Sequence, residues 1–222
     1  MCFLVFDTET TGFFLEQQPP GSPMQPHICQ LAAELCVEDG RVVAAMNLLI
    51  KPHNWGVPPQ AEAVHGISTA LCEQYGIPLN TVMGMFGTLV RRAKLAVCFR
   101  HVFDHGMIWT ELIRAQNATV LADYLALPSF CAMEASVPVL NLPPTERMIA
   151  AGYGGKPKTP NLQEAHKFYF GVGFEDAHDA SADVAATRRV FFEMKKRGLV
   201  PLPAAPSAEA PPSTLSNEPM EV

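Results

Sequence analysis

The sequence lacks several features that would place it in a specialised class of protein. No hydrophobic run in its 222 residues is long enough to form a membrane-spanning helix. The N-terminus has no basic segment ahead of an apolar one, which argues against a secretory signal peptide. None of the six cysteines belongs to a CxxC pair, so we expect reduced core thiols and no structural zinc site. These absences favour a cytoplasmic, intracellular protein with no membrane partner.

Basic residues are also scarce. The chain has 16 Lys and Arg against 22 Asp and Glu, a net charge of −6, which by itself disfavours a nucleic-acid partner. Three of the 22 acids lie beyond residue 200, where there is no basic residue, so the body carries 16 positive against 19 negative groups. If several of those acids hold metal, the remaining surface suits modest, local binding of a phosphate ligand. It does not suit tight binding along a long duplex.

The length suits one domain followed by a tail. The chain is 48% hydrophobic, which is enough for a substantial core. Residues 200–222 contain six prolines, four alanines and few hydrophobic side chains, a composition that predicts disorder. We therefore expect a domain over residues 1–199 and a disordered tail over residues 200–222, through which a protein partner could bind.

The N-terminal stretch FLVFDTETTG, residues 3–12, joins an apolar strand to two acids. The apolar run from Cys2 to Phe6 predicts a short strand that ends at Asp7 and Glu9. Side chains alternate along a strand, so the two carboxylates point to the same face. The strand could simply run out into a polar turn. Alternatively, the pair holds a cation that prefers oxygen ligands, such as Mg²⁺ or Mn²⁺.

The remaining pattern predicts an α/β layered domain with a mixed sheet of about five strands. Further strands are expected over residues 28–37, 41–50, 95–99 and 127–133, with a hairpin turn at residues 38–40. Helical segments are expected over residues 61–65, 68–75, 79–94, 104–116, 143–151, 162–170 and 179–197. In this scheme Asp104 stands at the N-cap of its helix.

More acids and a histidine stand at the ends of these elements, where α/β sheets build their sites. Asp104 follows the strand at residues 95–99, and His178 and Asp183 lie at the start of the last helix. In a continuous helix His178 and Asp183 would point about 140° apart. Both can face one pocket if His178 lies just before the helix. Taken singly, Asp104 could be only a helix cap and His178 a surface loop residue.

Together these motifs resemble the DEDDh group of 3′→5′ exonucleases, the family of the bacterial proofreading subunit and RNase T. The first motif is matched by Asp7-Thr-Glu9-Thr-Thr-Gly12, the end of the second by Phe103-Asp104, and the third by His178-Asp-Ala-Ser-Ala-Asp183 with its H-x4-D spacing. Val64-His65-Gly66-Ile67 and Phe170-Gly171 are similar to lesser signatures. The resemblance covers nearly all of residues 1–197.

The resemblance implies an RNase H-like fold and two divalent cations, Mg²⁺ with Mn²⁺ as a substitute. It makes Asp7, Glu9, Asp104 and Asp183 the metal ligands and His178 the general base. Two cations ~3.5–4 Å apart can clamp the attacking and leaving oxygens of a phosphodiester, and histidine titrates near neutrality, as a base should. The implied activity releases nucleoside monophosphates from single-stranded 3′ ends, with DNA favoured and RNA second, in DNA proofreading or repair.

The resemblance also suggests the residues that contact the substrate, namely Thr8, Thr10, Phe13, His65 and Arg100. The aromatic ring of Phe13 would wedge against the terminal base. The residues alone also allow Phe13 to pack on the sheet edge and His65 to be a satisfied core histidine. Lys156, Lys158 and Lys167 form either a solvated face or a contact with the phosphate backbone.

One departure from the family pattern bears on activity. The family usually has His or Tyr followed by Asn at the positions of Phe99 and Arg100. The hydrogen bonds of the Asn are lost, and Arg100 either contacts phosphate instead or marks a weakened enzyme. The alternative is therefore a nucleic-acid-binding or polymerase-accessory protein of the same fold. A haloacid-type phosphatase is disfavoured, because Glu9 replaces the second Asp that its DxD motif needs.

Overall fold

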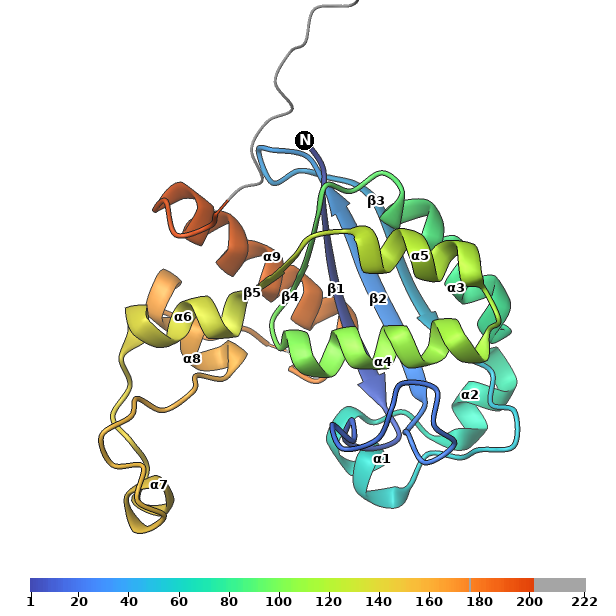
Figure 1. Cartoon of the computed structure of the whole chain (residues 1–222), viewed down its shortest axis with the longest axis horizontal. Coiled ribbons are helices and arrows are strands. Elements are labelled where there is room, and N and C mark those ends of the chain that lie inside the picture. The colour runs from blue at the N-terminus through green and yellow to red at the C-terminus, as the bar shows by residue number, and fades with distance from the viewer. Residues whose placement is uncertain (176, 202–222) are drawn as a thin grey trace, which may run out of the picture.

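A five-stranded sheet of order β3-β2-β1-β4-β5 forms the centre of the molecule (Figure 1). The computed structural model describes residues 1–175 and 177–201. The strands are β1 (Phe3–Thr10), β2 (Ile28–Cys36), β3 (Val42–Leu49), β4 (Leu95–Cys98) and β5 (Ser129–Cys131). β2 pairs antiparallel with β1 and β3, whereas β4 is parallel to β1 and β5. The expected mixed sheet is confirmed.

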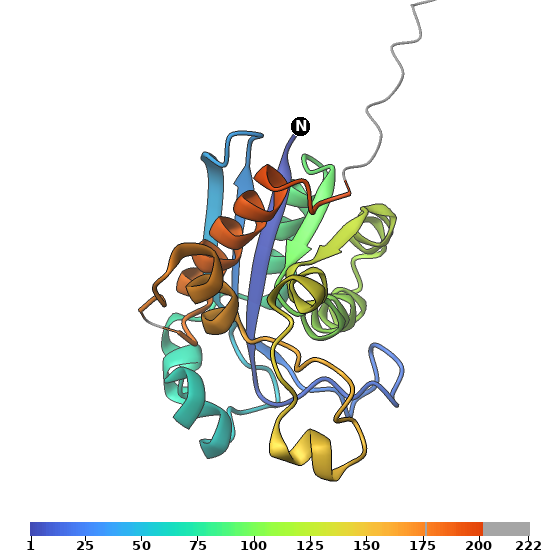
Figure 2. The same ribbon diagram turned by 90° about the vertical axis from the view of Figure 1, so that its left-hand side faces the viewer.

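Helices flank the sheet on both faces (Figure 1, Figure 2). The described residues contain α1 (Pro59–His65), α2 (Thr69–Tyr75), α3 (Leu79–Val90), α4 (His101–Arg114), α5 (Ala118–Ala126), α6 (Ala132–Leu140), α7 (Glu146–Ala150), α8 (Leu162–Phe170) and α9 (Ala180–Lys196). α3, α4 and α5 cover one face, and α9 crosses the other. None of the described helices is both long and apolar enough to cross a membrane.

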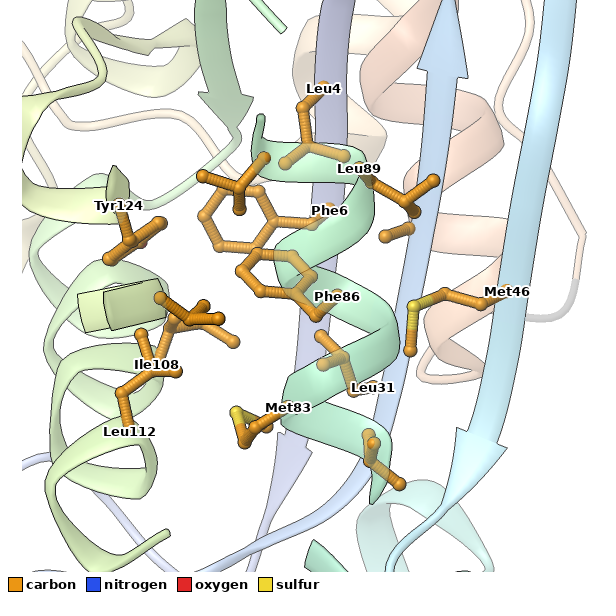
Figure 3. Packing of buried hydrophobic residues seen from close by; sticks show 14 of the residues in the cluster. Leu4, Phe6, Leu31, Met46, Met83, Phe86, Leu89, Ile108, Leu112 and Tyr124 are labelled. Carbon is orange, nitrogen blue, oxygen red and sulfur yellow. The ribbon is translucent and has the colours of Figure 1, made fainter. Parts of the chain in front are cut away.

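The two cores are divided by the alternation of side chains along β1. Leu4 and Phe6 belong to the cluster beneath α3, α4 and α5, where Phe6 meets the ring of Phe86 edge-on (Figure 3). Phe3 and Val5 belong to the opposite cluster, beneath α8 and α9. Continuing this alternation, Asp7 and Glu9 face the α9 side and Thr8 the α4 side. The core-forming part of β1 therefore fixes the direction of its acids.

One predicted boundary near the site was wrong. β1 runs through Asp7 and Glu9, where the strand was expected to end, and its pairing with β2 continues to Thr10. α4 begins at His101, three residues before Asp104, so Asp104 lies in the first turn and is not the N-cap. Its side chain accepts a hydrogen bond from Thr8 rather than capping the helix. Each acid is thus held inside a regular element, which leaves it less freedom than a loop would.

The helices α5 and α6 were not predicted. α5 is capped by the side chain of Asn117 and buries Val120 and Tyr124, four residues apart. α6 carries Pro138 inside the helix, and a proline there normally reads as a helix stop. The helix predicted over 79–94 ends at Val90, and the one predicted over 143–151 is limited to Glu146–Ala150.

The cysteines and the end of the domain can be compared with prediction directly. All six cysteines are free thiols, as expected. Val200 is buried among residues of the α9 core, one position beyond the predicted domain boundary. The predicted tail, including its suggested protein partner, falls almost entirely on residues 202–222, which lie outside the described part of the chain.

Candidate active site

The predicted acids and histidine meet where the carboxyl end of β1 approaches the start of α9. Glu9, His178 and Asp183 each offer a ligand atom, and these atoms lie within 4.8 Å of one another. Asp7 lies two residues before Glu9, on the same face of β1. The carboxylates of Asp104, Asp183 and Glu9 are near enough to raise the pKa of Asp7. The structure therefore brings all five residues into one site, although they come from β1, α4, α9 and the turn before α9.

This concentration of negative charge is costly without a counter-charge. Burial, followed by the neighbouring acids, raises the pKa of Asp7 well above its usual range and that of Glu9 to about 8. Burial also raises the pKa of Asp104 to about 7, although a hydrogen bond from Thr8 opposes the rise. The pKa of Asp183 is raised as well, mainly by burial. Ionised, the four acids would need a cation to offset their repulsion.

The start of α9 explains how His178 and Asp183 share a pocket. The side chain of Asp179 caps the helix by accepting hydrogen bonds from the backbone N–H groups of Ser181 and Ala182. His178 stands before the cap in a left-handed conformation, with φ at +71°. Its backbone N–H donates to Asp183 Oδ2 at 3.3 Å. The helix therefore begins after His178, as it must if His178 and Asp183 are to face one pocket.

Gln30 joins this site to the sheet and was not predicted. It lies opposite Glu9 in the pairing of β1 with β2 and is buried. Its Oε1 accepts from the backbone N–H of Ala180 at 3.3 Å, and its Nε2 donates to Asn47 Oδ1 at 2.9 Å. Gln30 thus holds the first residue of α9 beside β2. The sequence did contain a sign of this role, because Gln30 is the one polar residue in the apolar start of β2.

The two threonines of the first motif use their hydroxyls within the protein. Thr8 is buried and donates to Asp104 Oδ1 at 2.9 Å, and Thr10 is buried and donates to the carbonyl of Gly12 at 2.7 Å. Both contacts stabilise the edge of the site. A contact of either threonine with substrate stays a prediction.

His65 is half-buried beside the end of β1. Its Nδ1 accepts from the backbone N–H of Ile67 at 3.1 Å, which places the ring proton on Nε2, 3.3 Å from the carbonyl oxygen of Thr10. Burial lowers the pKa of His65, so the neutral form is favoured. The ring therefore links the end of α1 to the end of β1, the strand that carries Asp7 and Glu9. A contact of His65 with substrate stays a prediction.

Phe13 and Phe14 are adjacent in the sequence, but only Phe14 packs against the core. Phe13 is 79% exposed, so the interpretation that it packs on the sheet edge was wrong. Phe14 does the packing: a side-chain carbon at Gly106 would come within 2.6 Å of its ring. The ring of Phe13 is left exposed, three residues beyond the end of β1.

The proline-rich loop that carries Phe13 is fastened from within. Gln25 is buried, and its amide both donates to and accepts from the backbone of Leu15. The guanidinium of Arg114 donates to the carbonyls of Ser22, Gln25 and Pro26. These bonds replace the regular pairing that a proline-rich segment cannot make, and they hold the loop beside α4.

Arg100 lies at the rim of the site. It is exposed at the junction of β4 and α4, and its charge works against the raised pKa of Asp104. Phe99 beside it is buried. Both line a hollow of about 470 Å³, together with Met133 and residues 158–162. Of the three lysines considered above, Lys158 is ion-paired with Glu164.

The donor set fits a hard divalent cation. Carboxylate oxygens are the ligands that Mg²⁺ and Mn²⁺ prefer. Asp183 Oδ1 is buried and has no hydrogen-bond partner among residues 1–175 and 177–201. A cation there would satisfy this oxygen and offset the repulsion among the acids. The residues present therefore match the metal site that the motifs implied.

A family model described as "Exonuclease", the RNase T family, matches residues 4–191 of the chain. The chain belongs to this exonuclease family. The family generally uses divalent metal ions. The resemblance to the DEDDh exonucleases of the RNase H-like superfamily is confirmed.

Solved structures of exonuclease I share the fold of this exonuclease domain. E. coli exonuclease I in complex with a dT13 oligonucleotide superposes with a TM-score of 0.68 at 19% identity, covering 88% of this chain and 41% of that one. Its dA16 complex gives 0.67 at 20%, covering 88% and 41%. A product-bound exonuclease I gives 0.68 at 20%, covering 89% and 44%. The chain thus spans about two fifths of those proteins. No curated protein sequence matches it.

Proposed function

We propose that this chain is a metal-dependent 3′→5′ exonuclease that releases nucleoside monophosphates from single-stranded 3′ ends, with DNA as the favoured substrate and RNA as the second. One observation carries the proposal. Asp7 and Glu9 of β1, Asp104 of α4 and Asp183 of α9 share one site, with His178 next to Glu9 and Asp183. Such a site has the acids of a two-metal phosphodiesterase and a separate base.

The four carboxylates would hold two divalent cations, Mg²⁺ or, in its place, Mn²⁺. When bound, such a pair stabilises the charge on the attacking and leaving oxygens of a phosphodiester. The unpartnered Asp183 Oδ1 and the pKa values of Asp7 and Glu9, which burial and neighbouring acids raise, support this assignment, because a cation would satisfy the first and offset the charge repulsion. Thr8 supports Asp104 from the opposite side.

His178 would take the proton from the attacking water. Its ring is exposed, and one of its nitrogens lies within 4.8 Å of ligand atoms of Glu9 and Asp183. A base must reach the proton of its target directly or through one water. The backbone bond from His178 to Asp183 keeps the ring near the acids without occupying either ring nitrogen.

The rim of the site would receive the terminal nucleotide. The exposed ring of Phe13 offers a stacking surface for the last base, with His65 and Thr10 beside it. Arg100 would contact a phosphate, in place of the asparagine usual in the family. Complexes of exonuclease I with dT13 and dA16 support single-stranded DNA as the substrate. Thr8 would act through Asp104.

The test is nucleotide release from labelled oligonucleotides. The panel combines DNA and RNA, single and double strands, 3′-hydroxyl and 3′-phosphate ends, and Mg²⁺, Mn²⁺ or EDTA. We expect metal-dependent release of mononucleotides from single-stranded 3′-hydroxyl ends. Substitution of any metal-binding acid by Ala should abolish release, while Asp123→Ala on the surface of α5 serves as the matched control.

Two outcomes would contradict the proposal. Oligonucleotide binding without release, in either metal and with a folded protein, would favour the polymerase-accessory alternative and would implicate Arg100. Near-normal release by one of the four Ala variants at saturating Mg²⁺ would show that this acid is not a metal ligand.

A further inference from the structure

The segment between α6 and α8 projects from the body as an arm. We use this name for residues 143–157, which include α7. The base of the arm is closed by an antiparallel bridge between Leu142 and Lys158, in which the Lys158 N–H donates to the Leu142 carbonyl at 3.0 Å. Two perpendicular views place α7 at the end of the molecule toward which β1 points (Figure 1, Figure 2). The arm and the acids of β1 therefore lie at the same end.

The arm contributes little to the core. α7 has no buried residue, and the large side chains of Ile149 and Tyr153 are 57% and 54% exposed. Tyr153 lies beside Lys156, whose Nζ is 5.4 Å from the centre of the tyrosine ring. Burial therefore does not account for an aromatic ring at this position, and contact with a partner would.

The arm is also basic in an acidic chain. It carries Arg147 and Lys156 against Glu146, whereas the whole chain has 22 acidic and 16 basic residues. Both cations are exposed, and neither forms an ion pair within the described ranges 1–175 and 177–201. Lys158 at the base is different, because Glu164 neutralises it. The two remaining charges are available to an anion.

A hollow lies between the segment that follows the arm and the residues that precede the helix of Asp104. The 470 Å³ space described above is bounded on one side by residues 158–162, which follow the arm directly. Its other side is formed by Phe99 and Arg100, which precede the helix of Asp104. Arg100 is near enough to Asp104 for its charge to affect the pKa of that acid. Because Lys158 at the base of the arm also lines the hollow, a strand that passed Arg100 would reach the base of the arm.

We propose that the hollow and the arm bind the nucleotides that precede the terminal one in a single-stranded substrate. Tyr153 stacks on a base, and Lys156 and Arg100 contact phosphates. Single-strand sites combine these two features, a stacking ring and a cationic path for the backbone. The inference rests on the proposed function and extends it from the terminal nucleotide to the strand behind it.

The test compares two substrates of the full chain in Mg²⁺. One is a single-stranded oligo-dT, which can reach the arm. The other is the p-nitrophenyl ester of thymidine 5′-monophosphate, which fills only the terminal position. Tyr153→Ala should raise KM for oligo-dT roughly tenfold, the scale of one lost stacking contact. It should leave kcat/KM for the ester unchanged, and it should not lower Tm because the side chain of Tyr153 is exposed.

A lysine variant tests the electrostatic part. Lys156→Ala should weaken oligo-dT binding and reduce the slope of log KM against log salt by about 0.7, the value for one phosphate contact on a single strand. Tyr75→Ala on α2 and Lys94→Ala beside the amino end of β4 are matched exposed controls outside the arm. Both should behave as the wild type on both substrates.

The outcomes separate the two proposals. If the wild type hydrolyses neither substrate, the proposed nuclease function fails. If the wild type is active but the arm variants match their controls, the function stands and the arm inference is wrong. Equal losses on oligo-dT and on the ester would also overturn the inference, since the arm would then act on the terminal position or on the fold.

Discussion

The hydroxyl of Thr8 donates a hydrogen bond to Asp104 Oδ1 at 2.9 Å, joining β1 to α4 across 96 residues of sequence. Thr8 lies between the two acids of β1, but its side chain points to the opposite face of the strand. The two faces of β1 therefore contribute differently to the site. Asp7 and Glu9 face α9 and Asp183, while Thr8 holds Asp104 in place from the α4 side.

Removing this hydroxyl should weaken the metal site without removing a ligand. Thr8→Val keeps the size of the side chain but leaves a buried carboxylate oxygen unpaired, at a cost of about 1–3 kcal/mol. We expect a lower Tm. We also expect the Mg²⁺ midpoint, which is the Mg²⁺ concentration that gives half of the rise in Tm, to move to a higher concentration. Thr8→Ser keeps the donor and should restore the midpoint. An unchanged midpoint in Thr8→Val would show that this bond does not position Asp104.

Stability of the metal-free protein should fall as pH rises. The pKa of Glu9 is raised to about 8 in the fold, against ~4.3 for an unperturbed glutamate. The folded state thus holds this proton more tightly than the unfolded state. Its stabilising contribution is complete below about pH 4 and is lost as pH rises through about 8. Tm in EDTA should decrease across this window, and saturating Mg²⁺ should remove the decrease.

A substitution of Glu9 can show whether this residue causes the decrease of Tm with pH. Glu9→Gln cannot ionise, so the decrease of Tm with pH in EDTA should become shallower. Glu73→Gln, exposed on α2, should keep the wild-type slope. A wild-type Tm that rises between pH 5 and 8 would contradict the raised pKa.

His178 should matter for rate more than for metal binding. His178→Asn is the cleaner substitution, because asparagine tolerates the left-handed backbone at φ +71°. We expect kcat to fall ~10²–10⁴-fold, the usual loss for a general base, with the Mg²⁺ midpoint unchanged. Asp183→Asn is the comparison and should weaken both. If His178→Asn instead raises KM and leaves kcat near the wild-type value, His178 orients the substrate and is not the base.

Substitutions of Phe13 and Phe14 should have different effects, the first on activity and the second on stability. Phe13→Ala should lower activity on single strands while Tm stays constant, because its ring is 79% exposed. The lost stacking contact is worth ~1–3 kcal/mol. Phe14→Ala should lower Tm instead, because its ring packs over Gly106. A drop of several degrees in Phe13→Ala would indicate a packing role for Phe13.

Local pattern predicted how neighbouring side chains of the candidate site lie relative to one another. The period of two along a strand placed Asp7 and Glu9 on one face. The H-x4-D spacing required a helix that begins after His178, and the structure has α9 begin at Ala180. Such features depend on neighbours within a few residues, so they survive errors of several residues in the boundaries of an element.

Other features depended on contacts that no local pattern contains. The partner of Thr8 is 96 residues away and that of Gln30 is 150 residues away. Similarly, only the packing of the 13–27 loop decided which of two adjacent phenylalanines, Phe13 or Phe14, packs against the core. Proline inside α6 concealed a helix because tertiary packing outweighed its local preference.

The sequence by itself determined which side chains can form the site, because their types and their spacing within each strand or helix are properties of the chain. The tertiary structure alone decided how far each acid is buried, which groups hold it in place and where the arm lies. The burial that raises the pKa of Glu9 to about 8 comes from elements that meet only after folding. Desolvation and charge repulsion depend on distance in space, whereas a linear pattern records only distance along the chain.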